Sequence, residues 1–117
     1  VVEEVETVTD SRGRGVSSKM DASEASYFIN AVFPNLQHLE IEFCDRLVEV
    51  GALPTTLQSL KILHCEMLEE LPNMQTLLSL EKLTTTRCRK LKRIHGLGQL
   101  TKLQYLHVLG CSELEEL

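Results

Sequence analysis

The chain has 117 residues, of which 43% are hydrophobic, 25% charged and 4% aromatic, and its formal net charge is −5 at pH 7. This composition fits one small domain or part of a larger one, and no segment approaches the roughly 18 consecutive apolar residues of a membrane span or has the pattern of a signal peptide. The acidic balance argues against a generic nucleic-acid binder, which would present a basic face, so we expect neither a membrane nor a nucleic acid as partner.

Residues 1–32 differ in composition from the rest of the chain, because all 21 leucines lie at or after Leu36. We expect an irregular N-terminal segment over residues 1–32. Its first part, Val1–Val8, is acidic and rich in valine, which is also compatible with the tail of a preceding repeat. Residues 11–18 are rich in glycine and serine and predict a flexible loop.

The end of this segment contains the pattern of a short helix. Asp21 and Glu24 form a candidate capping box, and apolar residues follow with i, i+3, i+4 and i+7 spacing from Ala25. Pro34 would end such a helix, since the residue before a proline is disfavoured in helical geometry. The sequence therefore allows a helix over residues 21–32.

Residues 33–117 contain four copies of the spacing L-x-x-L-x-L-x-x-C-x-x-L-x-x-L. The copies start 21, 23 and 23 residues apart, at Leu36, Leu57, Leu80 and Leu103. The alternation over the fourth and sixth positions has the period of a strand with one buried face, whereas the later steps of three fit a 3₁₀-like or irregular arc. Thr85 stands at the sixth position of the third copy, so its buried hydroxyl is expected to need a backbone partner.

One copy cannot bury its own apolar face, so we expect successive copies to stack as coils of a right-handed solenoid with parallel strands about 4.8 Å apart. The predicted strands lie near residues 38–43, 59–64, 82–87 and 105–109. The leucines at the fourth position should stack inside: Leu39, Leu60, Leu83 and Leu106. Because the chain lacks an initiator methionine and stops at Leu117 within the pattern, we expect a fragment of a longer protein.

The repeat resembles the leucine-rich repeat family over residues 33–117. Cysteine at the ninth position, without the Gly-x-Ile-Pro turn of extracellular plant repeats, is similar to the irregular C-terminal repeats of plant nucleotide-binding, leucine-rich-repeat disease-resistance proteins. The segments Cys65–Pro72 and Cys111–Leu117 carry this likeness. The resemblance implies an α/β fold, a leucine-rich-repeat solenoid with four short parallel strands on its concave face and irregular or 3₁₀ convex arcs. It also implies a cytoplasmic protein in which residues 1–32 are an inter-repeat insertion.

The function implied by this resemblance is protein–protein recognition and regulation within an intracellular plant immune receptor. The partners would be a pathogen effector, a host target or neighbouring receptor domains, which the module would help to hold inactive. A generic leucine-rich-repeat scaffold or adaptor without an immune role is the alternative. The chain contains no G-x-x-x-x-G-K-[ST] phosphate loop and no recognisable nucleophile and base, so we expect no enzyme, no cofactor and no small-molecule substrate.

The ninth position of the copies is occupied by Cys44, Cys65, Cys88 and Cys111. Paired zinc ligands such as C-x₂₋₄-C are absent, and the four histidines fall at different repeat positions, so no metal site is expected. Equivalent positions on adjacent coils do lie within disulfide range. We favour a ladder of reduced thiols that donate to neighbouring carbonyls, because the resemblance implies a reducing cytosol.

The later part of each copy alternates in charge. The pair Lys92–Arg93 stands one repeat after Glu69–Glu70 and one repeat before Glu115–Glu116. We therefore favour ion pairs between neighbouring coils over an anion site, with Arg87 excepted because it lies nearer the strand.

Residues between the inward leucines should point out from the concave sheet, which solenoids use as an extended binding surface. Their character changes from copy to copy, while the inward residues stay nearly fixed. We call this predicted protein-binding set the sheet face: His38, Glu40, Glu42, Ser59, Lys61, Leu63, Lys82, Thr84, Thr86, Arg87, Tyr105, His107 and Leu109. Within it we single out Lys82, Tyr105 and His107, because aromatic and basic side chains are enriched among interface anchors.

Overall fold

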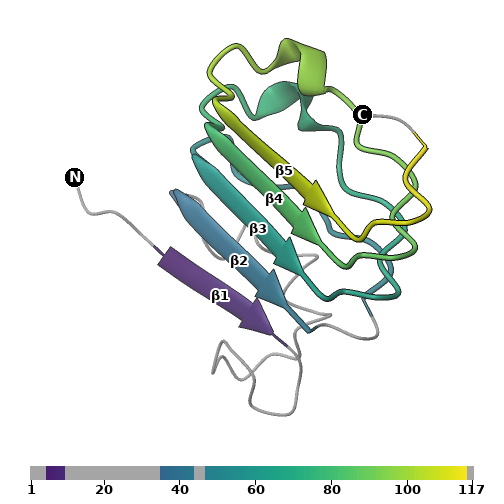
Figure 1. Cartoon of the computed structure of the whole chain (residues 1–117). Helices are drawn as coiled ribbons and strands as arrows, with labels where there is room; N and C mark the ends of the chain where they lie inside the picture. The colour runs from purple at the N-terminus through teal and green to yellow at the C-terminus, as the bar shows by residue number, and fades with distance from the viewer. Residues whose placement is uncertain (1–4, 10–34, 44–46, 116–117) are drawn as a thin grey trace.

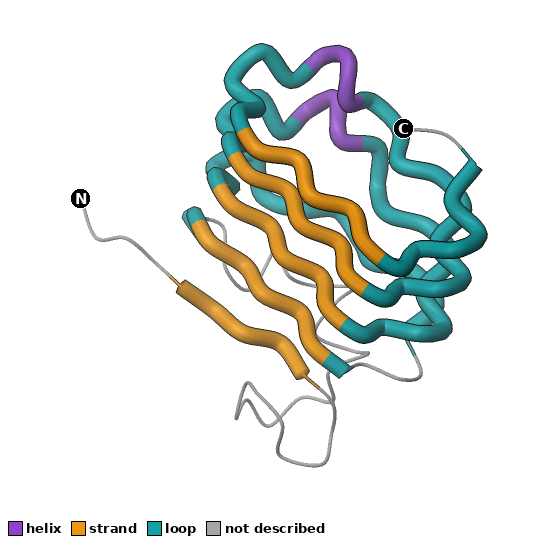
Figure 2. The backbone as a smooth tube through the Cα atoms, viewed as in Figure 1, coloured by secondary structure: helices purple, strands orange, loops and turns teal. Residues whose placement is uncertain are grey.

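In the described part of the chain, five short strands form one parallel sheet, in the order β1-β2-β3-β4-β5 (Figure 1). The structure is a computed structural model that describes residues 5–9, 35–43 and 47–115. The strands and the two 3₁₀ helices are β1 (Val5–Thr9), β2 (His38–Glu42), β3 (Ser59–Leu63), η1 (Met74–Thr76), β4 (Lys82–Thr86), η2 (Leu97–Gln99) and β5 (Tyr105–Leu109). After β3 and again after β4, the chain turns away from the sheet and returns through a 3₁₀ helix to begin the next coil (Figure 2).

The four predicted strands are all present and all pair in parallel. The register joins equivalent repeat positions, since Leu39 lies opposite Leu60 and Leu60 lies opposite Leu83. In the described part of the chain, the return segments consist of turns and 3₁₀ helices without an α-helix. The fold is therefore a parallel β-solenoid with 3₁₀ turns in its described arcs, as predicted. The described ranges also contain no helix long and apolar enough to cross a membrane.

Strand β1 extends the sheet beyond the predicted repeats. It lies within residues 1–32, where we expected an irregular segment, and it pairs with β2 so that Val5 faces His38 and Thr9 faces Glu42. This position agrees with the alternative that the first residues are the tail of a preceding coil. The predicted helix over residues 21–32 lies outside the described residues.

The core is a stack of inward side chains supplied by successive coils. Leu39, Leu60 and Leu83 are each at most 2% exposed, and burying a leucine fully contributes about 1.5–3 kcal/mol. Leu106 has the expected register opposite Leu83, but it is 41% exposed. The prediction of a buried Leu106 is corrected here, because β5 is the last strand of the described sheet and no described strand lies beyond it.

The chain leaves β2, β3, β4 and β5 through a left-handed residue. Phe43, His64 and Arg87 occupy the eighth repeat position and have φ values of 54°, 55° and 55°, and Gly110 has 71°. Their amides continue the sheet pattern, since His64 N donates to Thr86 O at 2.8 Å and Arg87 N donates to Leu109 O at 2.7 Å. This change of backbone conformation explains why the first three predicted strands end one residue earlier than expected.

Gly96 fixes the contact between the arcs that contain η1 and η2. Its φ is 87°, and an added Cβ would overlap Asn73 Oδ1 and lie 2.5 Å from the backbone nitrogen of Gln75. That same Asn73 oxygen accepts a hydrogen bond from the Gln75 N–H at 3.0 Å. A side chain at position 96 would therefore both strain the backbone and disrupt the start of η1.

Truncating one buried leucine should destabilise the stack far more than truncating its exposed equivalent. We expect Leu83→Ala to lower the free energy of unfolding by about 2–5 kcal/mol, because it removes a core side chain and leaves a cavity. Leu106→Ala is the matched control at the same repeat position, and it should cost about 1 kcal/mol or less because its side chain is already partly in water. Urea denaturation measures both, and equal losses would contradict the described end of the stack.

A second prediction concerns the two glycines of the last arc. Gly96→Ala should lower the free energy of unfolding by about 2 kcal/mol or more, since it combines a left-handed backbone with a clash against η1. Gly98→Ala, two residues away, meets no atom within 4 Å and should leave stability nearly unchanged. The comparison uses thermal unfolding of the two variants; similar melting temperatures would show that the η1 and η2 arcs are not held together as described.

Candidate functional site

The parallel register assembles the predicted sheet face into three rows that cross the strands. Outward residues alternate with buried ones along β2, β3 and β4, as the burial patterns require. The rows are His38, Ser59, Lys82 and Tyr105; Glu40, Lys61, Thr84 and His107; and Glu42, Leu63, Thr86 and Leu109. Arg87, the remaining predicted residue, directly follows β4.

One edge of the sheet face is acidic. Glu40 and Glu42 both point outward from β2, and a hydrogen bond between them, with partial burial and the charge of Glu40, raises the pKa of Glu42 above its ordinary value. Lys61 on the neighbouring strand opposes this shift. The two carboxyl groups therefore form a negative edge that ends where β3 begins.

A hollow of about 370 Å³ opens over β3, β4 and β5. Its lining consists of Lys61, Leu63, Lys82, Thr84 and Tyr105, all of which belong to the predicted sheet face. Tyr105 is 50% exposed and its ring stacks on that of His107, with centroids 6.1 Å apart and planes 10° from parallel. The hollow thus combines two ammonium groups with an aromatic wall and an aliphatic one.

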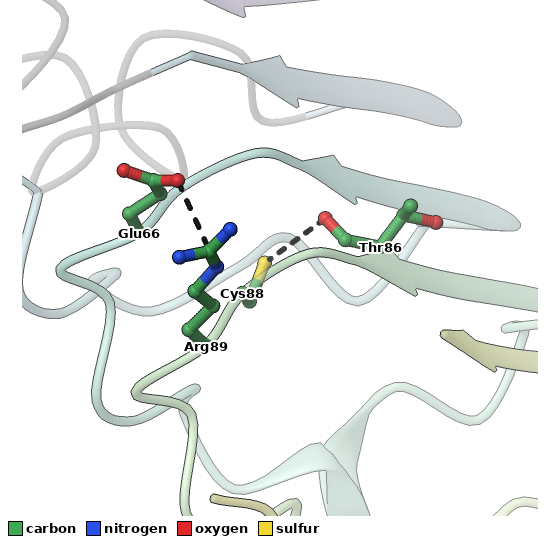
Figure 3. Close-up of polar contacts among 4 residues, drawn as sticks. All are labelled: Glu66, Thr86, Cys88 and Arg89. Carbon is green, nitrogen blue, oxygen red and sulfur yellow. Dashed lines mark hydrogen bonds and ion pairs between the residues drawn. The ribbon is translucent and has the colours of Figure 1, made fainter. Parts of the chain in front are cut away.

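The lysines of the hollow differ from three basic residues of the arcs, Arg89, Lys92 and Arg93. Among the described residues, ion pairs between coils join Lys92 to Glu69 at 3.7 Å and Arg93 to Glu115 at 3.8 Å, as the alternating charges predicted. Arg89 and Glu66 form a third such pair at 3.9 Å (Figure 3). Among the described residues, neither Lys61 nor Lys82 forms a direct ion pair, although Lys61 interacts electrostatically with Glu42 on the neighbouring strand.

A further surface, which the sequence analysis missed, runs along the strand exits next to Arg87. The rings of Phe43 and His64 stack there with centroids 4.8 Å apart and planes 12° from parallel. Non-glycine residues in left-handed conformations cost about 1–2 kcal/mol each, whereas Gly110 fills the same position in the fourth coil. The shared eighth repeat position was the signal that could have grouped these residues with Arg87.

The cysteines form the predicted ladder of thiols inside the solenoid. Cys65 donates its S–H to Ile41 O at 3.9 Å and Cys88 donates to Ile62 O at 3.7 Å, each reaching the preceding coil. Cys88 also lies 3.7 Å from Thr86 O in its own coil (Figure 3). Cys88 and Cys111 are free thiols, whereas Cys44 lies outside the described residues.

Cys111 satisfies the buried hydroxyl that interrupts the third copy. Its S–H donates to Thr85 Oγ1 at 3.6 Å and lies 3.8 Å from Thr85 O. The expectation that Thr85 would bond to a backbone group is therefore corrected, because the described partner of its hydroxyl is a side-chain thiol from the next coil. Thr85 itself is fully buried, so this contact offsets the cost of placing a hydroxyl in the core.

The two last cysteines differ in acidity. A side-chain hydrogen bond between Cys88 and Cys111, together with one involving Thr85, lowers the pKa of Cys111 to about 6 against the opposing effect of burial. The same hydrogen bond to Cys111, with burial, raises the pKa of Cys88 far above its ordinary value. Once Cys111 loses its proton, the Thr85 hydroxyl can donate to the sulfur instead, and this stabilises the thiolate.

The described ranges contain no group of three or more histidine, cysteine, aspartate or glutamate side chains that could hold a metal ion. No protein-family model matches the chain, and no curated protein or solved structure matches it either. The structure therefore establishes a repeat solenoid with an outward sheet face and a hollow on it, without assigning a family.

The acidity of Cys111 predicts the order in which the thiols react. At pH 7 and under native conditions, iodoacetamide should alkylate Cys111 before Cys88, since the thiolate is the nucleophile and Cys88 is buried and protonated. The rate at Cys111 should rise with pH through about 6 and then level off, whereas an ordinary cysteine gains reactivity up to about pH 8.5. Mass spectrometry of the proteolysed chain measures both sites.

Thr85→Val serves as the control for this acidity, because it removes one hydrogen bond to the Cys111 sulfur with little change in side-chain volume. In this variant, the inflection in the pH dependence of Cys111 alkylation should move to higher pH. A wild-type inflection near pH 8.5, or earlier labelling of Cys88, would contradict the described contacts.

Proposed function

We propose that the chain is a non-catalytic protein-recognition module that binds its partner through the sheet face. The observation that carries this proposal is the contrast between the two sides of each strand. Inward positions hold leucine, isoleucine and threonine buried at 2% exposure or less from β2 to β4, whereas outward positions carry acidic, basic, hydroxyl and aromatic side chains around a hollow. A rigid backbone whose outward side chains differ from coil to coil suits recognition, because the backbone loses little conformational entropy on binding.

We further propose that this module belongs to an intracellular plant immune receptor and acts in the cytoplasm. This finer assignment is supported by the resemblance of the repeats to those of plant nucleotide-binding, leucine-rich-repeat disease-resistance proteins. The ladder of thiols also suits a reducing compartment. A pathogen effector, a host target or a neighbouring receptor domain would then be the partner. A nucleotide-binding domain with a phosphate loop in the same reading frame supports this assignment, and its absence favours a general scaffold or adaptor.

The location of the binding surface can be tested without knowing the natural partner. A library of random 12-residue peptides is selected on the immobilised wild-type chain, and the recovered peptides are measured against two variants. The sheet-face variant is Tyr105→Ala with His107→Ala, which removes the stacked pair. The arc variant is Gln75→Ala with Lys90→Ala, which changes two exposed residues of the return segments.

We expect most recovered peptides to lose at least about tenfold in affinity, roughly 1.4 kcal/mol, on the sheet-face variant and to bind the arc variant like the wild type. Circular dichroism and thermal unfolding confirm that both variants remain folded. Peptides that depend on the arc residues and tolerate the sheet-face changes would place recognition on the opposite side and refute the proposal.

A further inference from the structure

We propose that the hollow on the sheet face binds the carboxylate side chains of an acidic polypeptide segment of the partner protein. This inference rests on the proposed function and specifies the chemistry of the partner. The hollow is lined by two exposed lysines from neighbouring strands, Lys61 on β3 and Lys82 on β4. In the described structure no carboxylate forms a direct ion pair with either ammonium group, and the charge of Lys61 acts on Glu42 of the neighbouring strand.

The positions of the two lysines set the spacing of the acidic groups that they accept. Lys61 faces Thr84, so Lys82 lies diagonally from it, one strand across and two residues along. A strand separation of about 4.8 Å and a rise of about 3.3 Å per residue place the two Cα atoms roughly 8 Å apart. Alternate side chains of an extended chain project to the same side about 6.6 Å apart, a gap that flexible lysine side chains can span. The arrangement therefore fits two acidic residues separated by one residue.

The walls of the hollow strengthen this pairing. Leu63 and Tyr105 line the space beside the lysines, and apolar walls lower the local dielectric, which increases the attraction between ammonium and carboxylate groups. The same walls can contact the methylene groups of aspartate or glutamate. Lysines without such apolar neighbours would offer neither effect and would contribute little to specific binding.

The charges around the hollow also orient the segment. Glu40 lies opposite Lys61, and Glu42 lies opposite Leu63 on the acidic edge of the sheet face. An acidic segment would be repelled from this edge and attracted towards β4 and β5, where Lys82 lies between Ser59 and Tyr105. Because the chain has a net charge of −5, the hollow is a local exception, and this contrast restricts where an acidic partner can dock.

The peptides selected on the wild-type chain provide the probe for this inference. We expect them to be enriched in aspartate and glutamate, with pairs of acidic residues separated by one residue. Fluorescence anisotropy then measures the tightest of these peptides and its matched form, in which the acidic pair is replaced by glutamine or asparagine. The matched form should bind at least fivefold more weakly, and the affinity of the acidic form should fall as salt is raised.

Substitutions on the chain test the two lysines individually. Lys61→Gln and Lys82→Gln should each weaken the acidic peptide at least threefold, whereas Lys90→Gln, an exposed lysine of an arc, should leave its affinity unchanged. Lys82→Glu should reject the acidic peptide and gain affinity for a form that carries lysine in place of one acidic residue. Such a reversal requires direct pairing, because a general loss of charge would not create the new preference.

The outcomes separate this inference from the proposed function. Peptides that depend on Tyr105 and His107 but lack acidic residues, or tolerate both lysine-to-glutamine changes, would overturn the acidic-segment inference and leave the sheet face as the binding surface. A twelve-nucleotide thymidine strand that binds as tightly, with the same dependence on Lys61 and Lys82, would show a general polyanion site and refute the polypeptide assignment. Peptides that ignore the sheet face altogether would refute the proposed function itself.

Discussion

The rest of this structure depends on the in-register parallel pairing of successive coils. Because each repeat position lies opposite the same position of the next coil, one repeat of sequence places leucine on leucine in the core and thiols beside the carbonyls of the preceding coil. It also sets basic residues of one arc next to acidic residues of its neighbours. No coil could hold these groups alone, since its apolar face would remain in water. The spacing of residues within one repeat therefore also determines which residues pack together between coils.

This constraint explains why the strand positions followed from the sequence and why several details did not. The period of two located β2 to β5 to within a residue, and the difference comes from the left-handed residues that follow β2, β3 and β4. Strand β1 was not predicted because its sequence lacks the leucine spacing, although it pairs in the same way. The exposure of Leu106 depends on whether another coil covers it, and this is a property of the stack that the repeat pattern does not contain.

The candidate site, too, was predictable from the sequence only in part. Alternation along a strand decides which side chains point outward, so the members of the sheet face could be named from the sequence. The hollow could not, because its shape depends on the relative sizes of side chains on three neighbouring strands, among them Lys82, Thr84 and Tyr105. The stack of Phe43 on His64 was missed because it follows from left-handed backbone after the strands, which only the structure reveals.

The two sides of the sheet have different roles, and this helps to interpret the two lysines of the hollow. Stability resides in the inward stack, and substitutions at exposed positions usually change it by only about 0.5 kcal/mol. Basic residues of the arcs such as Lys92 have carboxylate partners on the next coil, so their presence can be explained by the register of the solenoid. Neither Lys61 nor Lys82 forms such an ion pair among the described residues, although Lys61 interacts electrostatically with Glu42, so the ion pairs between arcs do not account for their positions. The two lysines lie beside an aromatic ring on an acidic protein, and the proposed acidic segment would supply them with carboxylate partners like those that the next coil supplies to Lys92.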